Sequence, residues 1–446
     1  MSRKLLANQQ AIRFYSSTYN SIYESIKIKL QNHLKNHEFQ FKAHHHTYSD
    51  TSIRNQHKIS GDGLWSPTLH FEKNQLSPSS SSLYSSLSST SELDQTNCNN
   101  DKPRRVTVIG GGSWGSAISK VIAGNVTKYP DLFDPEIVLY LRDENLRLVI
   151  EKTRVNIRYL QIKLPTNIKP VSDLKEAISR SDVLIFAIPH EYIKDVCFKI
   201  PKRSILTPRP VGVSLIKGLH IDGNGNLERT TQIISRMLDI PVGALSGANV
   251  ALSVAKEEFS EATLSPPLPS SPKVDEMLNK LFATSYFKIS TCYDTPTVEI
   301  CGALKNVISC GAGIIDGIGY GVNTKAAAIR AGIRESIRFV SIFHPEYKLS
   351  TFFENCGIAD AIGSSFGGRN RKVIEQFVKS TKSLAVLERE ILGGQKLQGP
   401  STGEVVNRLL DNRNLCDQFP FFTTIHRICN REEEPRAILK ALELSC

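Results

Sequence analysis

Continuous apolar runs bounded by turn residues recur along residues 105–247 of this 446-residue chain. They are RVTVIG at 105–110, IVLYL at 137–141, DVLIFAI at 182–188, VGVSLI at 211–216 and VGALSG at 242–247. Unbroken runs of this kind are typical of parallel strands whose two faces are both covered. The stretches between them are long enough for crossover helices, so the pattern predicts an α/β domain with a doubly wound sheet.

The apolar pattern changes to a helical period in the second part of the chain. One apolar stripe with spacings of 4, 4 and 3 is formed by Ile329, Ile333, Ile337 and Val340. Helix-compatible patterns also occupy residues 273–284, 295–310, 370–380 and 383–392. We therefore predict a Rossmann-like α/β domain at 103–291, followed by an all-helical C-terminal domain at 292–446.

Residues 1–102 have a different composition from the rest of the chain. Ten of the fifteen residues at 77–91 are serine, and residues 44–46 are three consecutive histidines. Such a stretch cannot bury enough apolar surface to compensate for the entropy lost on ordering. The composition predicts a disordered Ser/His-rich extension.

The start of this extension allows two interpretations. The first 23 residues contain Arg3, Lys4 and Arg13, no acidic residue and several serines. This composition is typical of a mitochondrial transit peptide, and RFYSS at 13–17 is similar to a matrix-protease cleavage site. The alternative is a tail that carries no targeting signal. The sequence does not decide between them.

Composition and charge narrow the function classes. Hydrophobic residues make up 40% of the chain and charged residues 22%, which excludes a wholly disordered protein. The net charge is +11, yet no basic stripe interleaved with aromatics is present, so we expect an anionic small-molecule substrate and no nucleic acid. Nine cysteines without C-x-x-C spacing predict reduced thiols and no metal site. No uncharged apolar window approaches 18 residues, so we expect no membrane partner.

A glycine-rich loop follows the first predicted strand. Residues 110–115 read GGGSWG, in which Gly110, Gly112 and Gly115 fit G-x-G-x-x-G between a strand and a helix. This arrangement brings a dinucleotide pyrophosphate to the backbone N–H groups at the start of a helix. The second strand ends in Arg142-Asp143. An acidic residue there favours NAD and an arginine accommodates NADP, so the residues alone leave the cofactor open.

Three lysines lie in uncharged surroundings: Lys217 in SLIKG, Lys305 in CGALKNVISC and Lys325 in GVNTKAAA. Burial lowers the pKa of a lysine and makes it a usable acid or base, although a structural salt bridge is the ordinary alternative. Residues 367–372, GGRNRK, place basic residues and an amide after two glycines at a helix start. That is a candidate phosphate site or simply a basic helix terminus.

These motifs together resemble the NAD-dependent glycerol-3-phosphate dehydrogenases of the eukaryotic soluble type. The resemblance runs from Arg104 to about Glu443 and rests on eight blocks in family order: VIGGGSWGSAI, FAIPHEYI, VSLIKG, SGANVA, TVEICGALKNV, NTKAAAIR, GGRNRKV and GQKLQGP. It implies a Rossmann-like domain followed by a helical domain, NAD as cofactor, and dihydroxyacetone phosphate and sn-glycerol 3-phosphate as substrates. It also implies a homodimer and a cytoplasmic location, with mitochondrial import through the extension as the alternative.

The resemblance assigns roles residue by residue. Lys305 matches the general acid of the family, and Lys217, Asn306 and Asp360 complete the implied catalytic set. Substrate binding is implied for Lys217, Ser364, Arg369 and Asn370. Cofactor contacts are implied for Gly110, Gly111, Gly112, Ser113, Trp114, Gly115, Arg142, Tyr192, Ala251, Arg369, Lys396 and Gln398.

Some positions depart from the family pattern. Animal members usually carry asparagine where Ser113 stands, phenylalanine where Arg142 stands, and aspartate where Val322 stands. Ser364 replaces a threonine and keeps the hydroxyl, and Tyr192 replaces a phenylalanine and keeps the ring. Arg142 therefore leaves room for NADP use, while no catalytic residue is missing.

Two rival functions can be told apart by sequence features. A β-hydroxyacid dehydrogenase would share a Rossmann domain, further helices and a catalytic lysine, but it does not need the phosphate clamp GGRNRK. A catalytically silent dinucleotide sensor would not need Lys217, Lys305 and Asp360 intact.

Overall fold

The computed structural model describes residues 102–201 and 209–445, which all belong to one compact unit. The predictions for the N-terminal extension concern residues 1–102. Residues 1–101 lie outside the described part of the chain.

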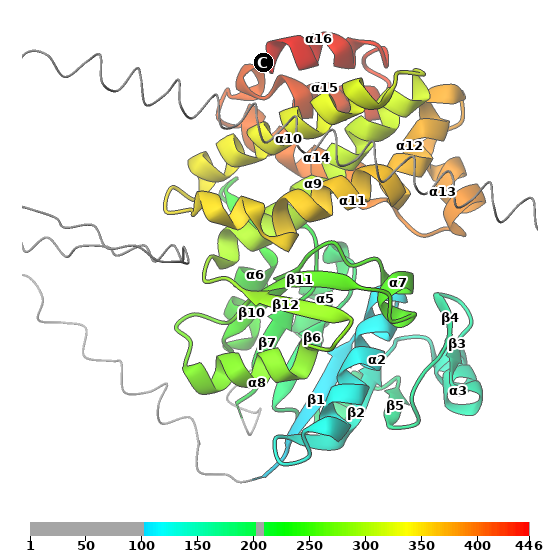
Figure 1. The fold of residues 1–446 in the computed structure, drawn as a ribbon, viewed down its shortest axis with the longest axis vertical. Helices are drawn as coiled ribbons and strands as arrows, with labels where there is room; N and C mark the ends of the chain where they lie inside the picture. The colour runs from blue at the N-terminus through cyan, green and yellow to red at the C-terminus, as the bar shows by residue number, and fades with distance from the viewer. Residues whose placement is uncertain (1–101, 202–208, 446) are drawn as a thin grey trace, which may run out of the picture. The chain divides into compact units, whose positions relative to one another are not determined.

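One eight-stranded sheet forms the centre of the first part (Figure 1). Its order is β12 (Phe287–Thr291), β11 (Ser260–Ser265), β10 (Val242–Ser246), β7 (Val211–Ser214), β6 (Val183–Phe186), β1 (Arg104–Ile109), β2 (Phe133–Tyr140) and β5 (Ile168–Val171). Every neighbouring pair is parallel except β10 and β11. The five predicted strands are all present, which confirms the α/β class. Three strands were not predicted: the antiparallel β11 and the two edge strands, β5 and β12.

The sheet is covered on both faces, as the unbroken apolar runs predicted. All four residues of β6 are buried, and they alternate between two separate apolar clusters. Val183 and Ile185 pack in one cluster with Ile118, whereas Leu184 and Phe186 pack in the other. The covering helices are α2 (Ser113–Lys128), α3 (Glu144–Thr153), α4 (Leu174–Ile178), α5 (Ile193–Lys199), α6 (Thr230–Leu238), α7 (Ala251–Ala255) and α8 (Pro272–Phe282).

The order of the strands locates the ligand edge of this sheet. From β1 the chain first builds β2 and β5 on one side, and it then returns to place β6 on the other side. In doubly wound sheets ligands bind beyond the carboxyl ends of the strands at such a reversal. Gly110 follows β1 and Ala187 follows β6 at this point. Two small hairpins lie outside the sheet, β3 (Val155–Asn156) with β4 (Leu160–Lys163), and β8 (Leu219–Ile221) with β9 (Leu227–Arg229).

Helices follow β12 to the end of the described residues. They are α9 (Thr295–Gly317), α10 (Val322–Phe343), α11 (Asp360–Gly367), α12 (Arg369–Lys379), α13 (Leu384–Leu392), α14 (Gln398–Asp411), α15 (Pro420–Cys429) and α16 (Ala437–Leu444). Short turns of helix also occur at η1 (His190–Tyr192), η2 (Leu349–Phe353), η3 (Asn355–Ala359) and η4 (Cys416–Gln418). The predicted apolar stripe lies in α10, where Ile329 and Val340 are buried. The domain boundary at residues 291 and 292 stays a prediction.

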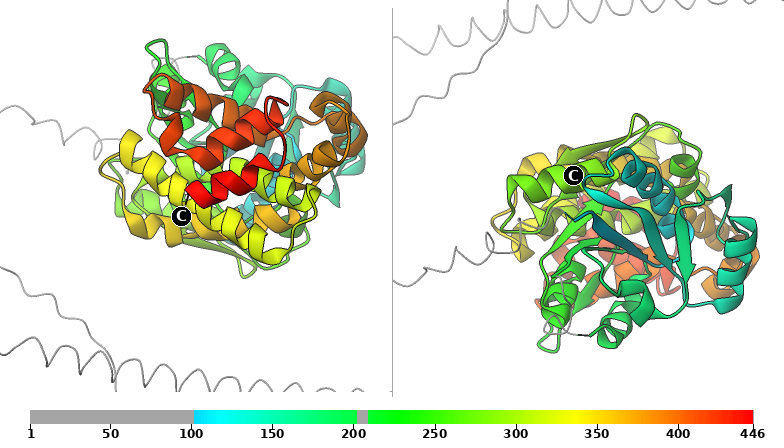
Figure 2. Two further views of the ribbon diagram at one scale, coloured as in Figure 1. Left: turned by 90° about the horizontal axis from the view of Figure 1, so that it is seen from above. Right: turned by 90° about the horizontal axis from the view of Figure 1, so that it is seen from below.

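Helix α9 is the core of the helical part. It packs against α10, α12, α14 and α15, and in Figure 2 the orange to red C-terminal helices lie beside the yellow α10. By length and composition α9 could cross a membrane, but 94% of its most apolar window is buried inside the protein. A helix that is apolar all round is one that other helices surround. Lys305 and Asn306 lie in the middle of this buried helix.

Candidate active site

The glycine loop connects β1 to α2 at the carboxyl edge of the sheet. Gly110 has φ +123°, and a Cβ there would lie 2.5 Å from the carbonyl oxygen of Ala187. A Cβ on Gly115 would lie 1.7 Å from the carbonyl oxygen of Gly110, so a side chain would force the helix away from the strand. A Cβ on Gly112, in contrast, would meet nothing within 4 Å. Packing therefore requires the first and third glycines, while the second faces open space.

This loop fits the phosphates of a dinucleotide. Gly112 is the N-cap of α2 and has no side chain to cap it, so the first backbone N–H groups of α2 are available to an anion. The side chains of the next two residues are engaged elsewhere. The Ser113 hydroxyl donates to the carbonyl of Tyr159 at 2.9 Å, and the Trp114 ring lies edge-on to Phe287 at 6.2 Å. Ser113 and Trp114 can therefore contact a bound phosphate only through their backbone N–H groups.

Arg142 and Asp143, the two candidates for contact with the cofactor ribose at the end of β2, have different partners in the structure. The Asp143 carboxylate caps α3 by accepting from the N–H of Leu146 at 3.0 Å, and it pairs with Arg158 at 3.3 Å. The Arg142 guanidinium instead lies over the Tyr192 ring, 5.7 Å from its centroid. Both Arg142 and Tyr192 are exposed at this edge. The arginine is thus available to a cofactor, while the carboxylate is committed to the helix cap.

Three further residues implied for cofactor binding are Ala251, Lys396 and Gln398. Ala251 is the first residue of α7. Lys396 is exposed and pairs with Glu388 at 2.9 Å. Gln398 begins α14, and its Oε1 lies 3.3 Å from Nδ1 of the buried His190.

A cluster of two lysines and one aspartate lies where β7 meets the helical part. The Lys217 ammonium donates to Oδ2 of Asp360 at 2.7 Å, and Lys305 lies 3.2 Å from Oδ1 of the same carboxylate. Lys305 also donates to the Ser364 hydroxyl at 2.7 Å, which in turn donates to Asp360 at 3.2 Å. Three distant segments thus share one largely buried carboxylate.

Burial controls the electrostatics of this cluster. Burial lowers the pKa of Lys305 to about 8, against the pull of Asp360, and the charge of Lys217 lowers it further. Burial alone would raise the pKa of Asp360, but the two lysines outweigh it and hold that pKa below its usual value. The cluster therefore has a carboxylate that stays ionised and a lysine able to exchange a proton near neutral pH.

A chain of amides continues from this cluster. Asn370 donates to Oδ1 of Asn306 at 3.0 Å and accepts from the N–H of Gly399 at 3.0 Å. Within the described part of the chain, three buried polar atoms near these residues have no hydrogen-bond partner: Nδ2 of Asn306, Nδ2 of Asn249 and Oγ of Ser246. Buried polar atoms are normally paired, so these groups fit a site that a bound ligand completes.

Other sequence candidates lie outside this cluster. Arg369 begins α12, is exposed, and donates to Oε1 of Gln395 at 2.7 Å. Lys325 pairs with Asp316 at 2.6 Å, and Arg371 contacts the same carboxylate at 2.5 Å. Lys325 thus belongs to an ion-pair network on α9, α10 and α12, which is the structural alternative that the sequence had left open.

The match to known sequences covers both parts of this site. Residues 105–269 match the family described as NAD-dependent glycerol-3-phosphate dehydrogenase N-terminus. Residues 294–440 match NAD-dependent glycerol-3-phosphate dehydrogenase C-terminus. The chain belongs to the NAD-dependent glycerol-3-phosphate dehydrogenase family. The first segment contains the glycine loop and Lys217, and the second contains Lys305 and Asp360.

Individual relatives support the same family. The chain is 43% identical over 343 residues to cytoplasmic glycerol-3-phosphate dehydrogenase (NAD+) of Drosophila ezoana, covering 76% of this chain and 96% of that protein. It is 40% identical over 333 residues to the cytoplasmic enzyme of Rattus norvegicus, covering 73% and 93%. The solved structure of Plasmodium falciparum glycerol-3-phosphate dehydrogenase is similar with a TM-score of 0.72 and 38% identity, covering 78% and 97%.

Some polar residues around this glycerol-3-phosphate dehydrogenase site carried little signal in the sequence. Ser246 and Asn249 lie in a motif that supported the family resemblance, but an isolated serine or amide predicts no chemistry. His190 precedes Glu191 and Tyr192, and only the fold shows that its ring reaches Gln398, more than 200 residues away. Gln395 contacts Arg369 from a loop that no periodicity marks.

Proposed function

We propose that this chain catalyses the NAD-dependent interconversion of dihydroxyacetone phosphate and sn-glycerol 3-phosphate. The observation that supports this most is the largely buried Lys305, 3.2 Å from Asp360 and with a pKa near 8. Ketone reduction needs a proton donor beside the oxygen on which charge develops, and an enzyme tunes such a group toward the working pH. The family match supplies the substrate class.

The residues that would hold the cofactor follow the edge of the sheet. Gly110, Gly111, Gly112, Ser113, Trp114 and Gly115 would hold the pyrophosphate, and Arg142, Tyr192, Ala251, Arg369, Lys396 and Gln398 would complete the site. When bound, NADH supplies the hydride for the ketone carbon. Gly112 would allow the phosphates to approach the backbone, because open space surrounds its missing side chain.

Each side chain of the Lys217, Lys305 and Asp360 cluster would have its own role at the ketone oxygen. Lys305 donates the proton to the developing alkoxide, and Lys217 provides a second cation that stabilises the same charge. Asp360 stays ionised and keeps both ammonium groups directed to one point. Asn306, whose buried side-chain NH2 group has no partner, offers a further hydrogen bond to the substrate.

The phosphate of the substrate would be held at the start of α12. Arg369 offers a bidentate donor there, and Asn370 adds an amide. Ser364 lies between this helix start and Lys305, to which it is hydrogen-bonded at 2.7 Å. Fixing the phosphate orients the carbonyl toward Lys305, which is the positioning part of catalysis. A simple hydroxyacid would have no use for Arg369 in this role.

The biological setting is also part of the proposal. We propose that the enzyme works in the cytoplasm, in keeping with the names of the relatives in Drosophila ezoana and Rattus norvegicus. We also propose that it is a homodimer, as the family resemblance implies. Import into mitochondria through the N-terminal extension is the alternative. The proposed partners are dihydroxyacetone phosphate and sn-glycerol 3-phosphate, with no nucleic acid and no membrane.

Oxidation of NADH with dihydroxyacetone phosphate as the sole acceptor tests this function. The enzyme should show turnover with that acceptor and little with a 3-hydroxyacid in the reverse direction. Lys305→Ala should lower turnover by about 10²–10⁴-fold while NADH affinity changes little, the usual scale for loss of a proton donor. Lys325→Ala is the matched control, because that lysine is paired with Asp316. Near-normal turnover of Lys305→Ala would exclude Lys305 as the acid.

A further inference from the structure

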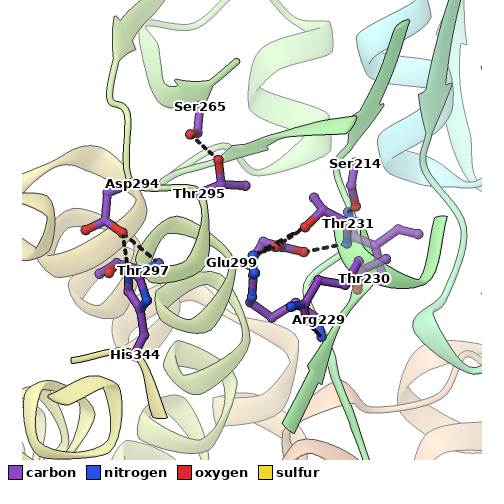
Figure 3. A network of polar contacts seen from close by, with 12 residues as sticks. Ser214, Arg229, Thr230, Thr231, Ser265, Asp294, Thr295, Thr297, Glu299 and His344 are labelled. Atoms are coloured by element: carbon purple, nitrogen blue, oxygen red, sulfur yellow. Dashed lines mark hydrogen bonds and ion pairs between the residues drawn. The ribbon is translucent and has the colours of Figure 1, made fainter. Parts of the chain in front are cut away.

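Glu299 is a buried carboxylate of α9 that the proposed mechanism does not use. Its side chain is 2% exposed and pairs with Nη1 of Arg229 at 3.0 Å. It also accepts from the backbone N–H of Thr231 at 2.9 Å and from the Thr231 hydroxyl at 2.5 Å (Figure 3). Arg229 is the N-cap of α6, and Thr231 lies in its first turn. Glu299 therefore ties the start of α6 to α9.

The start of α6 also contacts the backbone next to Lys217. The hydroxyl of Thr230 donates to the carbonyl oxygen of Gly218 at 3.3 Å. Gly218 also packs closely against His190, since a Cβ there would lie 2.5 Å from the Cβ of His190. The segment after β7 that carries Lys217 is thus held between α6 and His190.

The first half of α9 contacts all parts of this arrangement. Glu299, Gly302 and Lys305 follow one another at three-residue intervals, so each lies beside the next on the helix surface. A Cβ on Gly302 would lie 2.5 Å from Oγ of Ser246 and 3.6 Å from Cγ of Lys217. The missing side chain of Gly302 therefore leaves room for the Ser246 hydroxyl, and the stem of Lys217 lies close by. This stretch of the helix anchors α6, packs near Lys217 and carries Lys305.

We propose that Glu299 is a positioning residue that fixes Lys217 relative to Lys305 by anchoring the start of α6 to α9. The inference rests on the proposed function, in which both lysines act on one ketone oxygen. Their ammonium groups meet at Asp360 with separations of 2.7 Å and 3.2 Å, a geometry that a small shift of the Gly218 backbone would disturb. Small misplacements of this kind are costly even when the change lies away from the reacting atoms.

The test compares pH profiles of ketone reduction across a set of variants of the full chain. Glu299→Ala should lower kcat/KM for dihydroxyacetone phosphate by about tenfold or more, with the KM for NADH close to that of the wild type. Lys217 lowers the pKa of Lys305, so displacing Lys217 should move the alkaline limb of the profile to higher pH. Glu299→Gln keeps an acceptor for the Thr231 N–H and should recover most of the loss.

Asp294→Ala is the matched control. Asp294 is a buried carboxylate that caps the same helix by accepting from the N–H of Thr297, and Figure 3 shows both residues. It also accepts from the backbone N–H of Lys348 and from the hydroxyl of Thr351. Its contacts do not lead to Gly218 or Lys217. It should lower the melting temperature without moving the alkaline limb. A purely structural role of Glu299 would make the two alanine variants behave alike.

Thr230→Val keeps the inference testable if Glu299→Ala does not fold. It removes one hydroxyl with little change of volume and should shift the limb in the same direction. A wild-type limb in Thr230→Val, or in a folded Glu299→Ala, would overturn the inference. A wild type without activity on dihydroxyacetone phosphate would instead refute the proposed function, so the two failures are distinguishable.

Discussion

At the scale of single residues, the charge of Lys305 depends on its neighbours. Burial and Lys217 lower its pKa, whereas Asp360 raises it, and the balance lies at about 8. Lys325 lies in equally uncharged sequence, yet its partner Asp316 is one helix and nine positions away. The sequence could therefore identify both lysines as candidates for catalysis. It could not tell which one is in a structural ion pair, because that depends on which carboxylate the fold brings near each lysine.

The pH dependence of ketone reduction follows from this balance. The proposed mechanism needs protonated Lys305, so kcat/KM should fall as the pH rises through about 8, by about tenfold per pH unit beyond it. Glycerol 3-phosphate oxidation needs the neutral amine and should rise across the same range. Asp360→Asn removes the group that raises this pKa, so the limb should move to lower pH.

Steady-state profiles at saturating NADH check this expectation. Asp316→Asn is the control, because its carboxylate pairs with Lys325 and Arg371 rather than with Lys305. An alkaline limb that stays in place in Asp360→Asn would show that another group titrates there.

Use of NADPH beside NADH is also expected to depend on a single residue. The sequence left Arg142 and Asp143 as alternatives, and the structure commits Asp143 to the cap of α3. We expect NADH to be preferred, with measurable use of NADPH because Arg142 is free to meet a 2′-phosphate. Arg142→Phe should lower NADPH activity by about 10–100-fold, or ~1.5–3 kcal/mol, the scale of one charge-assisted hydrogen bond. NADH activity should change little.

Initial rates with both cofactors, in wild type and in Arg142→Phe, decide this point. An equal loss with NADH and NADPH would mean that Arg142 supports the loop through its contact with Tyr192 and does not bind the phosphate.

At the scale of elements, apolar runs predicted the buried central strands of the sheet but not β11 and β12 at one end of it. β11 and β12 contain polar and charged residues such as Glu261, Lys288 and Ser290, so no unbroken apolar run marks them. The reversal of direction between β10 and β11 depends on how the chain returns to the sheet, which periodicity does not encode.

The predicted end of α9 shows a second limit. A helix was expected over 295–310, but α9 continues to Gly317 through a glycine-rich segment. Glycine disfavours helix locally, yet a Cβ on Gly311 would lie 2.6 Å from Phe421 and one on Gly313 would lie 2.5 Å from the backbone of Arg371. Close packing of other helices requires these glycines, and that packing is invisible in local sequence.

The glycines of the cofactor loop should separate folding from binding. Gly115→Ala places a methyl group 1.7 Å from the carbonyl oxygen of Gly110, so we expect a loss of roughly 1–3 kcal/mol of stability together with NADH affinity. Gly112→Ala meets no atom within 4 Å and has φ −77°, which alanine tolerates. It should fold normally but bind NADH weakly, because the methyl group occupies the approach of the phosphates.

Thermal unfolding and NADH titration of the two variants test this distinction. The assignment of the loop fails if Gly112→Ala binds NADH as tightly as the wild type. It also fails in part if Gly112→Ala and Gly115→Ala lose the same stability, since packing would then explain both positions.

At the scale of the whole molecule, the site exists only where the sheet meets α9. Lys217 leaves the carboxyl end of β7, Lys305 projects from the middle of α9, and Asp360 begins α11. Two of these elements belong to the helical part and one to the sheet, so neither part contains a complete cluster. Two of the eight family motifs, VSLIKG and TVEICGALKNV, contain Lys217 and Lys305, whereas Asp360 lies in none of them. The proximity of Asp360 to both lysines is therefore a property of the fold and not of any one motif.

The last prediction concerns the N-terminal extension. Near the start of the described fold, the N–H of Arg104 donates to the carbonyl oxygen of Leu132 at 2.9 Å, and the N–H of Arg105 donates to the side-chain carboxylate of Asp182 at 2.8 Å. β1 lies between β2 and β6, so its pairing is complete without a preceding strand. Removing residues 1–102 should therefore leave a folded enzyme, with turnover close to that of the full chain and stability within about 1 kcal/mol. Removing residues 1–109 is the matched control and should prevent folding, because β1 is an interior strand with both neighbours. Turnover and thermal unfolding of the two truncated chains test this expectation. An insoluble or inactive chain starting at Pro103 would show that the extension packs on the enzyme.

The N-terminus of the protein isolated from cells tests the location. A cellular N-terminus close to Ser17 would favour import into mitochondria over the cytoplasmic location.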